Sequence, residues 1–149
     1  MMRSKWQLFA LSMGLLVSGV LQADLKRAQA EPNLEKRSQL AMDNALAAYQ
    51  AARTAYDKGD NTQAAASIAE IVESVDLADT SLRETGKDPR KSSKWFKRAE
   101  METRDLLRKL QSFQDTMGFE DRPMVDKVKA RVQQVHDDLL LGIMEGKHK

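Results

Sequence analysis

The amino-acid sequence predicts an all-α protein built as four long antiparallel helices in an up-down-up-down bundle. Four segments carry apolar residues at helical spacing, residues that stop and start helices separate them, and no segment has the alternating pattern of a strand. The length of 149 residues suits a single domain with one core. A content of 42% hydrophobic and 31% charged residues is typical of a globular chain.

Residues 1–23 have the order of a secretory signal peptide. Arg3 and Lys5 supply a positive start, and an uncharged, largely apolar run follows from Trp6 to Leu21. Ala23 is a small residue at a plausible cleavage point. A membrane span needs about 20 apolar residues, and this run is shorter. We therefore expect cleavage, and an uncleaved N-terminal anchor is the alternative.

Loss of this segment would change the charge of the protein. The full chain has 24 basic and 22 acidic residues, and residues 1–23 hold two of the basic residues and no acidic one. The mature chain would therefore have 22 of each, which does not favour nucleic acid as a partner. The chain has no cysteine, which excludes disulfides, a lipid-anchored cysteine and haem attachment through CxxCH. We expect an exported, soluble bacterial protein, periplasmic or secreted, with no transmembrane segment after cleavage.

The bundle is expected over residues 34–146, after a polar, flexible segment at 24–33 and before a short tail at 147–149. Apolar or small residues in each helical segment are spaced three and four apart, a repeat of about 3.5 residues that is typical of helices packed side by side. The expected seams are Met42, Ala45, Tyr49, Ala52 and Tyr56; Ala64, Ile68, Ile71, Val75, Ala78 and Leu82; Phe96, Ala99, Thr103, Leu106, Leu110, Phe113 and Met117; and Val125, Val128, Val132, Val135, Leu139 and Gly142.

The residues between the seams are typical of helix ends. Each junction combines a glycine, which can end a helix in the left-handed conformation, with an aspartate that can cap the next helix. Two junctions add a proline, which is favourable in the first helical turn. Links this short make consecutive helices antiparallel neighbours. The expected junctions are Gly59–Asp60, with Gln63 completing a capping box, then Gly86–Asp88–Pro89 and Gly118–Asp121–Pro123.

The first junction, "AYDKGDNTQA" at 55–64, resembles the turn of a tetratricopeptide repeat, because Gly-Asp lies between two helices and an alanine follows the glycine by five residues. The resemblance covers one hairpin. Ile71 and Asp76 stand where the repeat has alanine and proline, and no second copy follows. The whole chain looks like uncharacterised exported bacterial helical-bundle proteins, a resemblance that implies no function.

No residue pattern indicates catalysis. The chain has no nucleophile in a glycine-rich elbow, no glycine-rich phosphate loop and no marked pair of carboxylates. His136 lies beside the fourth seam, where we expect a boundary histidine bonded to solvent or to a neighbour rather than a metal ligand. We therefore expect a non-enzymatic binding or structural protein with no cofactor and no metal.

A haem carrier is the alternative function. The mature chain resembles small exported four-helix cytochromes of the b type, which hold haem between a methionine of the first helix and a histidine of the last. Met42 and His136 occupy those places in this sequence. The resemblance implies a small redox or ligand carrier with the cofactor in the core of the bundle.

The candidate interaction surface is "KDPRKSSKWFKR" at 87–98. On a helix that begins near Pro89, its cations fall within an arc of about 120° that points away from the third seam. If this surface binds a partner, we expect an anionic envelope component or a protein. The interpretation we favour over a binding site is a solvated charge pattern, partly neutralised if Asp76 and Asp79 of the second helix reach the third helix. The predicted basic patch consists of Arg90, Lys91, Lys94, Trp95, Lys97 and Arg98.

Overall fold

The computed structural model describes residues 25–146, and all of the regular structure in that range is helical. The long helices are α2 (Leu34–Asp57), α3 (Asn61–Glu84), α4 (Ser93–Thr116) and α5 (Pro123–Glu145). The prediction of an all-α, bundle-like protein is confirmed. The predicted signal peptide at 1–23 and the tail at 147–149 lie outside the described residues.

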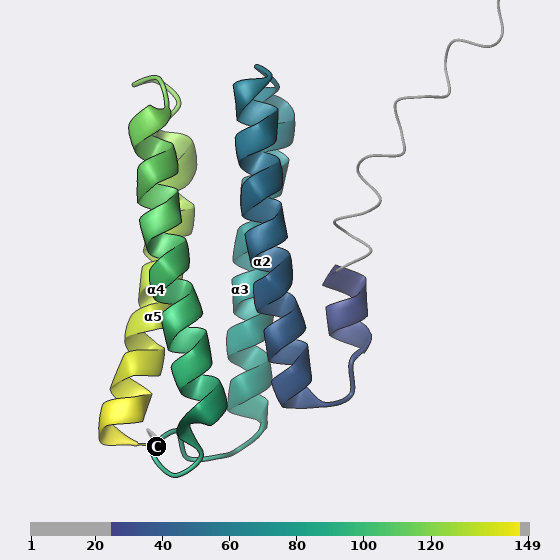
Figure 1. The fold of residues 1–149 in the computed structure, drawn as a ribbon, viewed down its shortest axis with the longest axis vertical. Helices are drawn as coiled ribbons and strands as arrows, with labels where there is room; N and C mark the ends of the chain where they lie inside the picture. Colours follow the sequence, from purple (N-terminus) through teal and green to yellow (C-terminus); the bar gives the residue numbers. More distant parts are fainter. Residues whose placement is uncertain (1–24, 147–149) are drawn as a thin grey trace, which may run out of the picture.

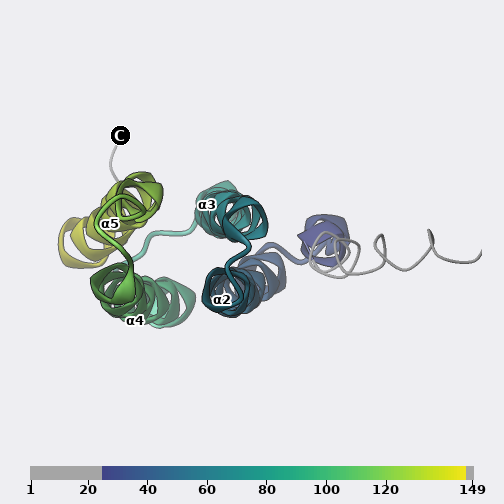
Figure 2. The same cartoon turned by 90° about the horizontal axis from the view of Figure 1, so that it is seen from above.

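The long helices stand side by side as two pairs. One pair is α2 with α3 and the other is α4 with α5, as the view along the helices shows (Figure 2). The α2–α3 and α4–α5 turns lie at one end of the molecule (Figure 1). The α3–α4 turn lies at the opposite end, together with the last turn of α5. That second end contains most of the predicted basic patch.

A further helical segment precedes α2. Residues 25–30 are helical, although the segment at 24–33 is expected from its composition to be polar and flexible. Leu25 and Ala28, three residues apart and therefore on one side of the helix, are both buried. Figure 2 places this segment beside α2, outside the two pairs. Its two apolar side chains explain why it folds onto the helices.

The core coincides with the expected seams. Every seam residue is buried except Tyr56, which is half-buried. Small side chains dominate between α2 and α3, where Ser38 Oγ donates a hydrogen bond to the carbonyl of Ala78 and Asn44 Nδ2 donates to Ser74 Oγ, both at 2.9 Å. Larger residues such as Leu110 and Phe113 fill the α4 side of the core.

The first predicted junction is confirmed. Gly59 has a φ of 79°, in the left-handed region that glycine adopts without steric cost. Asp60 caps α3, because its side chain accepts the Gln63 amide at 3.0 Å. Gly86, with a φ of 66°, likewise follows the end of α3.

The predicted caps of the last two helices are wrong, and so is the predicted start of α4, whereas α5 begins at Pro123, which was expected in its first turn. We expected Asp88 to cap a helix beginning near Pro89, but α4 begins at Ser93. The Asp88 carbonyl accepts the amides of Lys91 and Ser92 instead, which closes a separate turn at 88–92. The predicted cap Asp121 accepts a hydrogen bond from the Tyr56 hydroxyl at 2.9 Å. The N-cap of α5 is the next residue in the chain.

Within the described part of the chain, none of the helices combines the length and the apolar character needed to cross a membrane.

Candidate functional site

The predicted basic patch divides between a turn and a helix. Arg90 and Lys91 belong to the turn at 88–92, whereas Lys94, Lys97 and Arg98 lie on the first turns of α4. All of these cations are exposed. The predicted arc on a single helix face is therefore wrong for the first two cations, although the chain still brings them to the same end of the molecule.

Trp95 joins the patch to the core. Its side chain is half-buried and packs against the buried cluster. Lys94 Nζ lies 5.1 Å from the centroid of the indole ring, and the Arg98 guanidinium lies 6.0 Å from it. Both distances are within the range of a cation–π contact. Arg98 also pairs with Glu102 at 3.0 Å, and burial raises the pKa of the Glu102 carboxyl while Arg98 opposes that rise.

Four cations of the patch lack an acidic partner. Among residues 25–146, no carboxylate forms an ion pair with any of them, and each is exposed. The Asp88 carboxylate is close in sequence but accepts the backbone amide of Arg90 at 2.9 Å. The basic cluster, as we name this group, consists of Arg90, Lys91, Lys94 and Lys97.

Neighbouring cations at this end of the molecule are neutralised. Arg83 pairs with Asp79 at 3.0 Å and with Asp138 at 3.2 Å. Lys87, in the segment between α3 and α4, pairs with Glu35 at the start of α2. Among residues 25–146, the absence of ion pairs in the basic cluster therefore does not reflect a shortage of carboxylates at this end.

The acidic residues of α3 do not neutralise the patch. Asp76 reaches Arg131 of α5, with 2.7 Å between Oδ1 and Nε. Asp79 reaches Arg83 of its own helix. The expectation that these carboxylates could reach the third helix is wrong, because the patch lies on the outer side of α4 and they face α5.

The last turn of α5 contacts the turn that carries the first cations of the cluster. A Cβ added to Gly142 would lie 3.3 Å from Pro89 Cγ, and one added to Gly146 would lie 2.9 Å from Arg90 Cδ. These glycines therefore allow the turn at 88–92 to approach the helix closely. A side chain at either position would displace the turn or the Arg90 side chain.

A cavity of about 440 Å³ opens beside this contact. Its lining combines apolar side chains with the Asp79–Arg83–Asp138 ion pairs. The lining residues are Asp79, Arg83, Lys87, Pro89, Phe96, Asp138, Leu139, Gly142 and Gly146. Sequence reasoning missed this cavity. Gly142 was an available signal, because a glycine in a seam of larger residues leaves space that neighbours must fill or leave open.

Asp79 is the most buried charged group of the cavity. Burial raises the pKa of its carboxyl, because the charged form loses hydration, and the hydrogen bond and charge of Arg83 oppose the rise. The same contact raises the pKa of Arg83. Asp138 adds a second carboxylate beside the guanidinium. The cavity therefore has no uncompensated cation that would select an anionic ligand.

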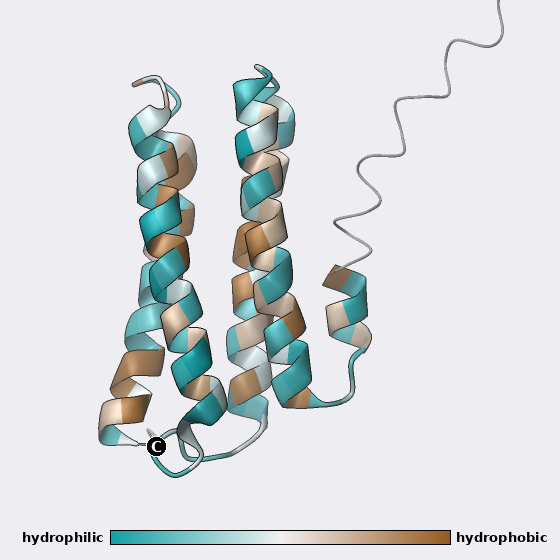
Figure 3. Ribbon diagram, viewed as in Figure 1, coloured by the Kyte–Doolittle hydropathy of each residue, from teal (hydrophilic) through white to brown (hydrophobic). Residues whose placement is uncertain are grey.

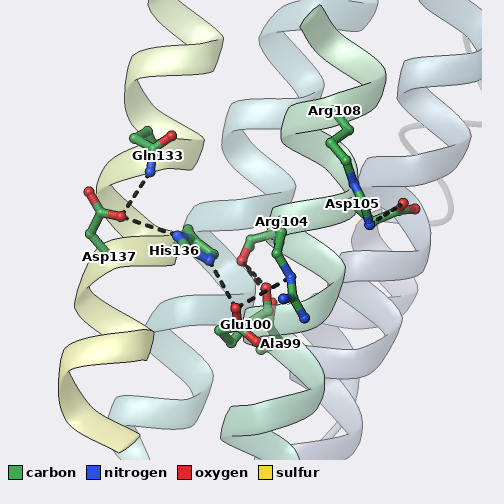
Figure 4. Close-up of polar contacts among 9 residues, drawn as sticks. Ala99, Glu100, Arg104, Asp105, Arg108, Gln133, His136 and Asp137 are labelled. Atoms are coloured by element: carbon green, nitrogen blue, oxygen red, sulfur yellow. Dashed lines mark hydrogen bonds and ion pairs between the residues drawn. The ribbon is translucent and has the colours of Figure 1, made fainter. Parts of the chain in front are cut away.

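His136 forms a separate polar cluster between α4 and α5 (Figure 4). Its Nε2 lies 3.0 Å from Glu100 Oε1 and its Nδ1 lies 3.1 Å from Asp137 Oδ1. Glu100 also contacts Arg104 at 3.6 Å. The Gln133 amide and His136 hold the pKa of the Asp137 carboxyl below its usual range. His136 thus occupies a boundary position and bonds to its neighbours, as its place beside the seam indicates.

The two residues of the haem alternative have different surroundings in the structure. Met42 is buried and lines a cavity of about 90 Å³ with residues of α2 and α4, and His136 is not part of that lining. Both ring nitrogens of His136 contact carboxylates. The two side chains therefore do not fit a haem held between them. The described residues also contain no group of three or more His, Cys, Asp or Glu side chains placed to hold a metal ion.

No known protein family matches the chain. No curated protein matches it either.

Proposed function

We propose that the protein is an exported, non-enzymatic binding protein of the bacterial cell envelope, and that it binds an anionic component of the envelope through the basic cluster. The observation that carries this proposal is the presence, at one end of the molecule, of four exposed cations that form no ion pair with residues 25–146, whereas the neighbouring Arg83 and Lys87 are paired.

Electrostatics at the start of α4 strengthens the argument. The first turn of α4 contains no acidic residue, and its N-cap Ser92 makes no side-chain capping bond. The positive end of the helix dipole therefore adds to the charges of Lys94 and Lys97 instead of opposing them. An anionic partner would relieve this repulsion, and contact with an anionic surface contributes about 1 kcal/mol per lysine or arginine at moderate salt.

The proposed scaffold for this site is the four-helix up-down-up-down bundle. Ser38, near the start of α2, bonds to Ala78, near the end of α3. Gln114, near the end of α4, bonds to Asp126, near the start of α5, at 2.6 Å. Both contacts join the beginning of one helix to the end of its neighbour. They support antiparallel packing within each pair.

Binding to a simple polyanion tests the proposed site. We expect the wild-type protein to bind dextran sulfate at low salt and a Lys91→Glu/Lys97→Glu variant to bind at least about tenfold more weakly. These two side chains are exposed and make no ion pair among the described residues, so their reversal should leave the fold unchanged.

The matched control reverses two lysines at the opposite end of the molecule. Lys58 and Lys127 are also exposed and lack ion pairs within residues 25–146. A Lys58→Glu/Lys127→Glu variant has the same net charge as the first variant and should bind like wild type. Equal weakening in the two variants would assign binding to net charge and would refute the site, as would a wild-type protein that does not bind.

A further inference from the structure

The outer face of α4 continues the positive charge beyond the basic cluster. Two members of the cluster lie on this helix, and a methionine and two arginines follow them at alternating spacings of three and four residues. This spacing places all five side chains on one face of the helix. All five are exposed. The cationic stripe, as we name this row, consists of Lys94, Lys97, Met101, Arg104 and Arg108.

The cationic stripe lies opposite the buried face of α4. Met101 in the middle of the stripe is 57% exposed, whereas the seam residues Phe96 and Leu110 are buried. Hydrophilic residues predominate on this helix in Figure 3. At 1.5 Å per residue, the row from Lys94 to Arg108 is about 21 Å long. The stripe is therefore a long site that is one side chain wide.

The two arginines of the stripe form ion pairs within α4, at its surface (Figure 4). Arg104 contacts Glu100 at 3.6 Å, and Arg108 contacts Asp105 at 3.4 Å. The two arginine side chains are 55% and 74% exposed. Exposed pairs of this kind contribute little to stability, so the arginines can exchange these carboxylates for anionic groups of a partner. A guanidinium group binds a carboxylate or a phosphate through two parallel hydrogen bonds.

From this row of cations we infer that a linear acidic polymer lies along α4, with its anionic groups against the cationic stripe. The inference rests on the proposed function and names the class of the anionic component. The basic cluster would bind one part of the polymer, while Arg104 and Arg108 would bind the anionic groups further along the chain. A chain of acidic repeat units presents its charges in a row, which matches the length and the narrow width of the stripe.

Two other anionic partners fit the outer face of α4 less well. A rigid acidic protein surface would hold fixed carboxylates against Asp105, an exposed acid beside the stripe, and like charges that meet in an interface are unfavourable. Helices that bind a bilayer interface place an apolar face in it. The apolar face of α4 is buried in the core, and Met101 is the one apolar residue of the stripe. A flexible polymer avoids both costs, because its charged groups can lie on either side of Asp105.

The test compares two sulfated probes of different shape, with the full chain at low salt. Dextran sulfate is a linear polyanion, whereas sucrose octasulfate is compact and too short to span the stripe. An Arg104→Gln/Arg108→Gln variant should bind dextran sulfate at least about fivefold more weakly than wild type, which is the effect of one cation on binding to an anionic surface. Sucrose octasulfate should bind equally to the variant and to wild type, because the basic cluster is unchanged.

The matched control removes two exposed charges at the opposite end of the molecule. A Lys58→Gln/Lys127→Gln variant has the same net charge as the arginine variant and should bind both probes like wild type. Circular dichroism of all variants checks that the helices are intact. Vesicles of phosphatidylglycerol should bind wild type more weakly than dextran sulfate does at the same concentration of anionic groups. Tighter binding to the vesicles would assign the stripe to a bilayer and overturn the inference.

The outcomes separate this inference from the proposed function. If Arg104→Gln/Arg108→Gln keeps wild-type affinity for dextran sulfate while Lys91→Glu/Lys97→Glu loses it, the linear site is overturned and the basic cluster stands. An equal loss for both probes in the arginine variant would indicate a compact site and would also overturn the inference. If wild type does not bind dextran sulfate, both proposals fail.

Discussion

Replacement of Leu110 by alanine is expected to destabilise the folded protein strongly. Leu110 lies on α4 and is 0% exposed, so the full transfer free energy of its side chain contributes to folding. Leucine has three carbon atoms more than alanine, and each buried CH₂ contributes about 0.8 kcal/mol, or about 2.4 kcal/mol in total. The cavity left behind adds to this cost, which brings the expected loss to about 3–5 kcal/mol.

Leu46 supplies the matched control for this prediction. The same substitution on α2 removes a side chain that is 40% exposed, so only part of the transfer free energy is lost and no closed cavity forms. We expect Leu46→Ala to cost less than about 1.5 kcal/mol. Urea unfolding followed by circular dichroism measures both free energies. Similar costs for the two variants, or a cost near zero for Leu110→Ala, would refute the core described above.

Three further outcomes are expected. Tyr56→Phe should lower the free energy of unfolding, measured by urea denaturation, by about 1–2 kcal/mol. The substitution removes the hydrogen bond to Asp121 and the hydroxyl that accepts the Gly118 amide. Burial raises the pKa of Asp79, so the folded state binds its proton more tightly than the unfolded state. The Tm of the wild type minus that of Asp79→Asn should therefore fall as pH rises from about 4 through the raised pKa, and it should stay constant above that pKa. A value that is the same at every pH would contradict this. Mass spectrometry of the protein from the exported fraction should find a chain that starts near Asp24, and a peptide containing Trp6 would indicate an anchor instead.

Much of the fold could be predicted because the spacing of apolar residues within each helix indicates which of its residues are buried. A seam such as Val125, Val128 and Val132 can be identified from the sequence of one segment alone, since helical geometry places those residues on one face. The capping box at Asp60 is similarly local, because its donor and acceptor are three residues apart. Local patterns of this kind predict which face is buried without any knowledge of the partner helix.

The caps expected at the second and third junctions are replaced by other contacts, one local and one distant in the chain. Asp88 and Asp121 both have the residue type of a helix cap. Asp88 instead closes a turn before α4, and Asp121 accepts the hydroxyl of Tyr56, which is 65 residues away in the chain. The second contact exists only after the helices have packed. No pattern within the α4–α5 junction could have indicated it.

The candidate site was only partly predictable for the same reason. The positive charges of Lys94 and Lys97 are visible in the sequence, but the absence of ion pairs to them among residues 25–146 is not. Ion pairing depends on where carboxylates that are distant in the chain lie. Glu35 at the start of α2, for example, pairs with Lys87 in the segment between α3 and α4. The exposure of Leu140 and Leu141 had a local signal, since three consecutive leucines at 139–141 cannot all face one core.

The salt dependence of polyanion binding tests the central claim most directly. Each cation that neutralises an anionic group on the partner releases counterions, so the logarithm of the affinity falls linearly with the logarithm of the salt concentration, by about 0.7–0.9 per cation on nucleic acids. Titration of dextran sulfate over a range of salt concentrations should therefore give a slope that is smaller by roughly 1.4–1.8 in Lys91→Gln/Lys97→Gln than in wild type. The Lys58→Gln/Lys127→Gln variant should keep the wild-type slope. Identical slopes for all three proteins would contradict the assignment of binding to the basic cluster.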